Sequence, residues 1–176
     1  VLVGWSYGGL VISNYLQQYG DDSIGGLNFV AGVATLGTEA ASRLIGPGIM
    51  DLAPGLLSED LAENIAATRQ LILNCSVKPP SPDDLEMTLA YNMMAPPNVR
   101  NWMFARTETF DGAETKVKVP TLVTQGTLDT VILPEMADLF MNAIPNAQKS
   151  IYEGIGHAPF MENTERFNRE LGELAR

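Results

Sequence analysis

Three residues of this sequence have the side chains needed for nucleophilic catalysis: Ser6, Asp129 and His157. Ser6 lies in the run Gly-Trp-Ser-Tyr-Gly at positions 4–8, and His157 is the only histidine of the chain. A serine hydroxyl is almost never ionised near pH 7, so it attacks a carbonyl group only when a base accepts its proton. These residue types together predict acyl transfer to water.

The glycine-rich run around the serine joins two predicted elements. The apolar residues 1–4 precede it as a strand, and a helical pattern over residues 10–19 follows it. A turn this tight strains the serine backbone, and we expect Gly4, Gly8 and the glycine after it to let strand and helix approach. The serine hydroxyl would then stand clear of the sheet, and the backbone N–H of Tyr7 would point at a developing oxyanion.

The predicted acid, Asp129, follows a strand over residues 120–125, where a carboxylate at the carboxyl end of a parallel strand faces the crevice of the sheet. It could also be only a turn or cap residue. Asp138 has the spacing of a helix surface and Asp111 precedes a glycine in a predicted turn, so both are weaker candidates.

His157 follows the last predicted strand, in a loop whose glycines allow close approach. A lone histidine is more often structural, but the chain order of nucleophile, acid and base is the one used by hydrolases with such a strand-turn-helix elbow. We therefore expect Ser6 to attack, His157 to carry the proton to the leaving group, and Asp129 to fix the imidazole tautomer and stabilise its cation.

Predicted strands and helices alternate along the chain around these three residues. Strands are predicted over residues 1–4, 26–34, 120–125 and 148–153. Helices are predicted over 10–19, 58–74, from an N-cap at Ser81, over 134–143, and in a final segment with Phe167, Leu171 and Leu174 on one face. This alternation predicts an α/β fold with a mostly parallel sheet and helices on both faces.

Residues 35–112 carry no strand pattern and are predicted to form a helical cap inserted into a core of residues 1–34 and 113–176. The strand at residues 1–4 would be an unprotected apolar edge, so we expect further strands to precede it. We also expect a cytoplasmic location, with a signal peptide left open because the sequence begins without Met inside a predicted strand.

Composition excludes several classes of protein. The chain has 176 residues, 45% of them hydrophobic and 18% charged, as expected for one globular domain. No apolar run is long enough to span a membrane, and a net charge of -10 without a basic cluster argues against nucleic-acid binding. Cys75 is the only cysteine and is predicted to be buried and inert. We expect neither a metal nor a cofactor.

Three segments together resemble the α/β-hydrolase superfamily: Gly-Trp-Ser-Tyr-Gly-Gly at 4–9, Gln-Gly-Thr-Leu-Asp at 125–129 and Gly-His-Ala-Pro-Phe-Met-Glu at 156–162. They look like those of small serine esterases, enol-lactonases and cofactor-free haloperoxidase-like enzymes. The resemblance implies an eight-stranded sheet in which residues 1–4 are the fifth strand, so that the first four are absent. It also implies that a loop among them supplies the second amide of the oxyanion hole, beside that of Tyr7.

The expected function is a serine hydrolase that cleaves a small or medium carboxylic ester or lactone. The resemblance implies that a serine at this turn argues against haloalkane dehalogenases and epoxide hydrolases, which use aspartate there. Perhydrolase and C–C bond hydrolase activities of the same fold stay open, as do a ligand-binding protein with little turnover and an inactive truncation. The expected partners are a small apolar acyl substrate and water, and the oligomeric state is open.

Pocket residues are predicted by position alone. Trp5 neighbours the nucleophile, Thr130 and Val131 follow the acid, and Trp102 lies in the insertion. The insertion is also rich in Met87, Met93, Met94, Met103 and Phe104, which either line an adaptable apolar pocket or form the core of the cap.

Overall fold

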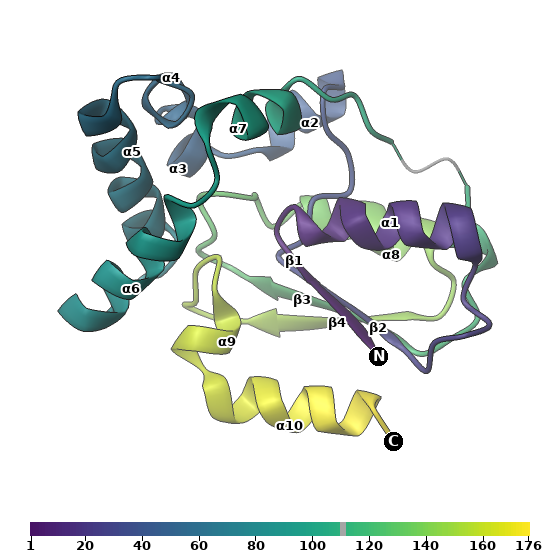
Figure 1. The fold of residues 1–176 in the computed structure, drawn as a ribbon. Coiled ribbons are helices and arrows are strands. Elements are labelled where there is room, and N and C mark those ends of the chain that lie inside the picture. The colour runs from purple at the N-terminus through teal and green to yellow at the C-terminus, as the bar shows by residue number, and fades with distance from the viewer. Residues whose placement is uncertain (110–111) are drawn as a thin grey trace.

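The computed structural model describes residues 1–109 and 112–176, which fold around a four-stranded parallel sheet (Figure 1). The strands are β1 (Leu2–Trp5), β2 (Leu27–Val30), β3 (Thr121–Gly126) and β4 (Ala147–Tyr152), and they are neighbours in that order. Leu27 pairs with Leu2 on one side and Thr121 on the other, so the strands start level. Because all four run parallel, their carboxyl ends meet at one edge of the sheet.

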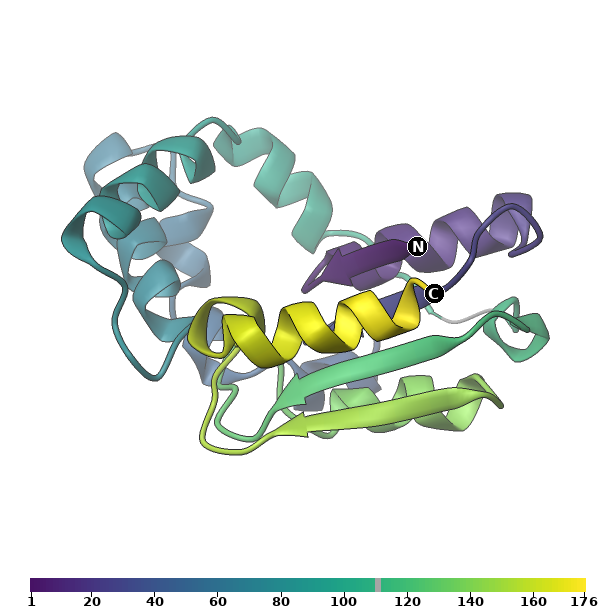
Figure 2. The same ribbon diagram turned by 90° about the horizontal axis from the view of Figure 1, so that it is seen from below.

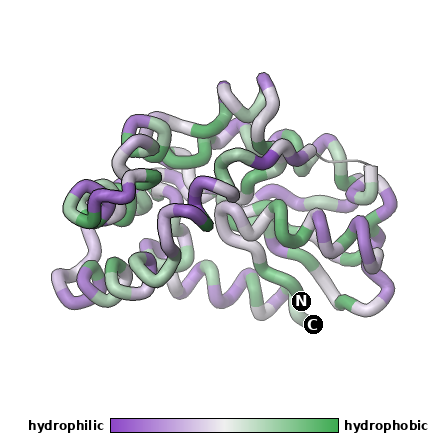
Figure 3. Tube along the Cα trace, turned by 45° about the horizontal axis from the view of Figure 1, so that its top comes forward, coloured by the Kyte–Doolittle hydropathy of each residue, from purple (hydrophilic) through white to green (hydrophobic). Residues whose placement is uncertain are grey.

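Helices cover both faces of this sheet, which confirms the predicted fold class. Helices α1 (Gly8–Tyr19) and α8 (Met136–Ala143) lie on one face, and α10 (Thr164–Leu174) lies on the other (Figure 1). The rings of Phe29 on β2 and Phe140 on α8 pack with their centroids 4.2 Å apart. In the tube of Figure 3, hydrophilic and hydrophobic residues alternate along the helices.

The segment between β2 and β3 leaves the sheet at the carboxyl edge of the strands. Its described residues form a group of helices that we call the cap helices. They are α2 (Glu39–Leu44), α3 (Pro47–Met50), α4 (Ala53–Leu56), α5 (Leu61–Asn74), α6 (Pro82–Asn92) and α7 (Pro97–Phe104). In Figures 1 and 2, α5 and α6 stand to one side of the sheet, and α2 and α7 lie toward the top of Figure 1. An antiparallel bridge between Leu36 and Glu108 pairs the two ends of the excursion. The predicted cap also contains residues 110–111, which lie outside the described residues.

The chain returns to the sheet through the short helix η1 (Glu114–Lys116), and α9 (Pro159–Glu162) lies between β4 and α10. Two predicted boundaries differ from the structure by three residues or more. Strand β2 ends at Val30 and not at residue 34, because Ala31 adopts a left-handed backbone with φ of 43°. Helix α5 begins at Leu61, since Asp60 and not Ser58 accepts the capping hydrogen bond from the Glu63 N–H.

The N-cap of α6 was predicted correctly, with Ser81 accepting from the Asp84 N–H. Strand β1 has β2 as its one hydrogen-bonded neighbour within the described sheet, and Val1 and Val3 are each 45% exposed. Within residues 1–109 and 112–176, none of the helices combines the length and the apolar character that crossing a membrane requires.

Candidate active site

Ser6 occupies the turn between β1 and α1 in a strained conformation. Its φ is 55°, in the left-handed region that non-glycine residues rarely adopt. The Ser6 N–H donates to the Val30 carbonyl at 3.0 Å, and the Ser6 carbonyl accepts from the Gly9 and Val33 N–H groups. Such strain costs of order 1–3 kcal/mol and persists only where the surrounding structure fixes it. Here the backbone of β2 and of the loop after it fixes the serine.

The glycines around Ser6 differ in how much the turn depends on them. A Cβ on Gly4 would lie 2.5 Å from the Gly8 carbonyl oxygen, and one on Gly9 would lie 2.7 Å from the Val33 carbonyl oxygen. A Cβ on Gly8 would meet no atom of the described residues within 4 Å. The expectation that Gly8 provides room was therefore wrong, because strand and helix meet at Gly4 while the following loop meets the helix at Gly9.

The backbone N–H of Tyr7 is the amide predicted to face an oxyanion. It precedes the first turn of α1, where helix N–H groups lack carbonyl partners and carry partial positive charge. Among residues 1–109 and 112–176 this N–H donates to no acceptor. It is therefore free to donate a hydrogen bond to a bound group.

Asp129 and His157 form a buried pair. Oδ2 of Asp129 lies 2.8 Å from Nδ1 of His157, and the two residues are 3% and 1% exposed. The other carboxylate oxygen accepts from the N–H groups of Val131 and Ile132, both at 2.9 Å. The side-chain amide of Gln125 also donates to Oδ2, at 3.1 Å. These donors compensate the carboxylate for its lost hydration and hold it toward the imidazole.

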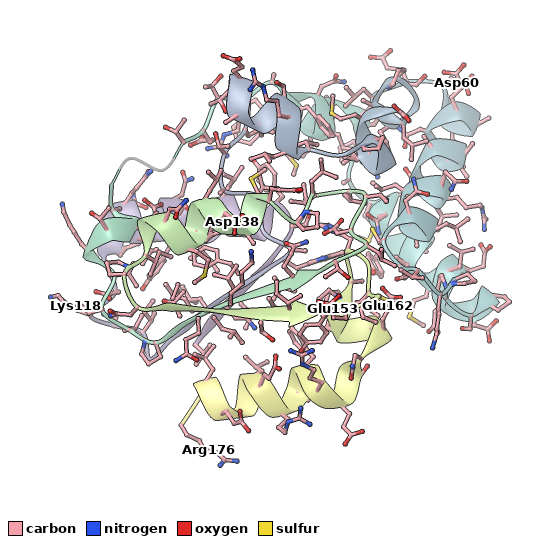
Figure 4. The ribbon with its side chains drawn as sticks, turned by 180° about the vertical axis from the view of Figure 1, so that it is seen from behind. Asp60, Lys118, Asp138, Glu153, Glu162 and Arg176 are labelled. Atoms are coloured by element: carbon pink, nitrogen blue, oxygen red, sulfur yellow. The ribbon has the colours of Figure 1, made fainter. Side chains whose placement is uncertain are left out.

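The two weaker candidates for the acid take no part in this pair. Asp138 lies on α8 and binds Lys149 at 2.6 Å, with its side chain 58% exposed (Figure 4). Asp111 lies outside the described residues.

The loop that carries His157 is held from two sides. The indole N–H of Trp5 donates to the His157 carbonyl at 2.8 Å, and the two rings lie 5.3 Å apart. On the other side Glu162, the last residue of α9 and labelled in Figure 4, accepts from the N–H groups of Gly156 and Val77. The strand that leads into the serine turn thus also positions the histidine backbone, while Glu162 ties the loop to the chain after α5.

Ser6 and His157 open onto a common cavity of about 470 Å³ between the sheet edge and the cap helices. Trp5 and Val131 line it, as predicted by position. A second cavity of about 120 Å³ is lined by Ser6 and Tyr7, so the serine lies where the two spaces adjoin. Most of the other lining side chains are apolar residues of the cap, among them Ile49, Leu71, Met103 and Phe104.

Two of the predicted pocket residues lie elsewhere. Trp102 is 62% exposed, and the guanidinium of Arg106 lies 4.9 Å from the centroid of its ring. Thr130 packs against α3, where its carbonyl accepts from the Gly48 N–H. Met87 and Met94 are also exposed, and of the methionine, tryptophan and phenylalanine residues named in the insertion only Met103 and Phe104 line the large cavity.

Several residues at the site were not predicted. Gln125 donates a hydrogen bond to Asp129, and one feature of the sequence could have indicated this role. A polar residue at the end of a predicted apolar strand needs a buried hydrogen-bond partner. Cys75 lines the cavity, and burial raises its pKa to about 12 with a smaller effect from Asp129, so its thiol stays protonated. Arg100 of α7 also lines the cavity and had no signal in the sequence. Within the described residues no cluster of three histidine, cysteine or acidic side chains could hold a metal.

The sequence and the fold define the family of this chain. Residues 1–164 match the model of the alpha/beta hydrolase fold family, and the chain belongs to that family. The solved structures that it resembles include an esterase from Rhodococcus sp. ECU1013, with a TM-score of 0.91 and 30% sequence identity. A putative aryl esterase from Burkholderia cenocepacia superimposes with a TM-score of 0.84 at 28% identity.

Among curated proteins, the chain is 27% identical over 177 residues to the pimeloyl-[acyl-carrier protein] methyl ester esterase of Vibrio vulnificus (strain YJ016). The match covers 97% of this chain and 68% of that protein. The two solved structures are covered to 64% and 62% of their lengths, and this chain to 99% and 98% of its own. The chain therefore spans about two thirds of the length of these relatives.

Proposed function

We propose that this protein is a serine hydrolase that cleaves a small or medium carboxylic ester or lactone. The observation that carries the proposal is the buried Asp129–His157 pair, whose imidazole opens onto the same cavity as Ser6. A histidine held by a buried carboxylate is the base that a serine nucleophile needs.

The proposed reaction has two steps. Ser6 Oγ attacks the ester carbonyl while His157 accepts its proton, and Asp129 stabilises the imidazolium through Nδ1. The tetrahedral oxyanion accepts a hydrogen bond from the Tyr7 N–H. It collapses to an acyl-serine as His157 gives the proton to the departing alkoxide, which leaves as the alcohol. Water then attacks the acyl group and gives a proton to His157, which returns it to Ser6 as the acid leaves.

The surroundings of Ser6 favour a substrate with apolar portions. The two cavities that adjoin at Ser6 provide separate spaces for the two sides of a scissile bond. Their mainly apolar lining stabilises acyl or alcohol groups by removing apolar surface from water. The two relatives from Vibrio vulnificus and Rhodococcus are named as esterases, which supports an ester as the bond that is cleaved.

The proposal is tested by measuring hydrolysis of p-nitrophenyl butyrate by the wild-type protein and by Ser6→Ala. We expect a loss on the order of 10⁴-fold or more in kcat, because the remaining groups act without a nucleophile. Binding of the ester to Ser6→Ala should persist and can be measured by calorimetry. Saturable binding by the wild-type protein without turnover would instead indicate a ligand-binding protein of this fold.

A further inference from the structure

Arg100, in the cap helix α7, lines the same cavity as Ser6 and His157. Its Nη1 donates to Thr68 Oγ1 at 2.8 Å and to Asn64 Oδ1 at 3.3 Å. Its Nη2 donates to the Asn92 carbonyl, at the carboxyl end of α6, at 2.7 Å. The guanidinium of this α7 residue is thus held by acceptors on two other helices of the cap, α5 and α6.

The two side-chain acceptors are themselves buried and fixed. Asn64 is 2% exposed and Thr68 is 1% exposed. The Asn64 amide donates to the carbonyls of Leu56 and Ser58, and the Thr68 hydroxyl donates to Asn64 Oδ1. Because this network is built from side chains of fixed orientation, the position of the Arg100 head group is determined before any ligand binds.

All three acceptors of Arg100 are neutral. Among residues 1–109 and 112–176 no carboxylate forms an ion pair with it, although the chain carries 21 acidic residues. The Nε–H of Arg100 and one N–H of its Nη2 have no acceptor among the described residues. Burial lowers the pKa of this guanidinium, because the cation loses hydration that no facing anion replaces. A cation beside a mainly apolar cavity is costly unless an anion neutralises it.

We propose that Arg100 binds a carboxylate carried by the substrate, so that the ester or lactone cleaved at Ser6 is an anionic one. This inference rests on the proposed function and adds to it the charge of the substrate. Arginine suits the role, since its planar guanidinium matches the geometry of a carboxylate and stays charged when partly buried. The carboxylate lies on the acyl portion or on the leaving alcohol, and the experiment distinguishes the two.

The test uses isosteric pairs of esters that differ only in charge. For the acyl portion, p-nitrophenyl esters of glutaric, adipic and suberic acid carry either a free terminal carboxylate or a terminal carboxamide. For the alcohol, butyrate esters of 4-hydroxybenzoate and 4-hydroxybenzamide are compared. After subtraction of the uncatalysed rate, we expect kcat/KM of wild-type protein to favour the anionic member of at least one pair by about tenfold or more, as a charge-assisted hydrogen bond gives.

The preference should depend on Arg100 and not on net charge. Arg100→Gln should abolish it, by lowering kcat/KM for the anionic member about tenfold or more relative to kcat/KM for the carboxamide. Arg69→Gln is the matched control: it removes the same charge from α5, where Arg69 pairs with Glu86 at the surface, and should keep the preference. Equal rates within every wild-type pair, or equal losses on both members in Arg100→Gln, would overturn the inference.

A binding measurement separates this inference from the proposed function. Titration calorimetry with adipate and adipamide needs no turnover, so it tests Arg100 even if no ester is hydrolysed. We expect the wild-type protein to bind adipate and not adipamide if the charge lies on the acyl portion, or 4-hydroxybenzoate and not 4-hydroxybenzamide if it lies on the alcohol. If Arg100→Gln does not fold, Arg100→Lys should weaken this binding at least about threefold, because lysine offers a point charge in place of a planar fork. Failure of the wild-type protein to bind either acid contradicts the inference.

Discussion

The sheet edge and the cap position their functional side chains by different means. At the sheet edge, most of the hydrogen bonds that fix these side chains come from backbone groups. Ser6 is fixed by the backbone of Val30 and Val33, and Asp129 by the backbone amides that follow it. In the cap, Arg100 is held chiefly by the side chains of Asn64 and Thr68. Few apolar side chains of the cap helices are buried, whereas the core cluster runs through the sheet and α8.

This difference separates the reaction from the choice of substrate. Backbone hydrogen bonds depend on the fold and tolerate changes of neighbouring side chains, so the reacting groups are fixed by the sheet itself. Side-chain networks depend on the identity of each member. We infer that the cap can change its ligand preferences by substitution without moving the reacting groups. Four predictions test this difference between the sheet edge and the cap.

The largest effect is expected at the sheet edge. Asp129→Asn should lower kcat on the order of 10³- to 10⁴-fold, because an amide no longer stabilises the imidazolium and favours the wrong tautomer. Asp138→Asn is the control, an identical change in an exposed carboxylate of α8 that pairs with Lys149. The prediction is checked by steady-state ester hydrolysis. A kcat of Asp129→Asn above one tenth of the wild-type value, or an equal loss of kcat in Asp138→Asn, would show that the buried pair is not the acid and base.

The second prediction concerns the turn itself. Gly4→Ala should lower the free energy of unfolding by roughly 1–3 kcal/mol, since the added methyl group would lie 2.5 Å from the Gly8 carbonyl oxygen. Gly8→Ala should change it by less than about 1 kcal/mol, because that methyl group meets open space in a helical position. Urea unfolding of both variants measures the difference. Equal destabilisation would mean that the strand and helix do not meet at Gly4.

The third prediction concerns the cap. Asn64→Ala leaves the carbonyls of Leu56 and Ser58 without their amide donor and removes one of the three acceptors of the Arg100 guanidinium, which should cost about 1–2 kcal/mol. Hydrogen exchange measured by mass spectrometry should show this loss in α4–α7. The amides of β2 and β3 should keep their protection, because the core does not depend on the network. Equal losses in the cap and in the sheet would show that the two regions unfold as one unit.

The smallest effect is expected at Asp21, which ties the loop after α1 to the chain before β3. The Lys118 N–H lowers its pKa most, partial burial opposes this, and the Val119 N–H adds to the lowering. The native state therefore binds this proton more weakly than the unfolded chain, whose aspartate has a pKa of about 3.9. The resulting stability is complete above that value and is lost as the pH falls through the lower native pKa.

Asp21→Asn should accordingly reduce the free energy of unfolding by no more than about 1 kcal/mol near pH 7, since the amide oxygen still accepts. The difference from wild type should shrink below pH 4. Urea unfolding at pH 7, 5 and 3 measures it. A difference that grows toward low pH would contradict the direction of the shift.

The sequence predicted the sheet edge well because local patterns determine it. A strand, a glycine turn and a helix lie within 19 residues, and the Asp129 carboxylate accepts from amides two and three positions further on. The end of β2 was missed because a left-handed alanine has no signal in composition. Arg100 was missed because its partners lie 36 and 32 positions earlier in the chain, on a helix whose packing no periodicity reveals.

The most direct test of the account is covalent labelling of the nucleophile. The purified protein is treated with a fluorophosphonate, digested, and examined by mass spectrometry, with His157→Ala as the comparison. We predict one adduct per chain, on Ser6, and labelling slower by on the order of 10²-fold or more in His157→Ala, because the base that activates the serine is lost. Labelling at another residue, or equal labelling of the two proteins, would contradict the assignment of Ser6 and His157.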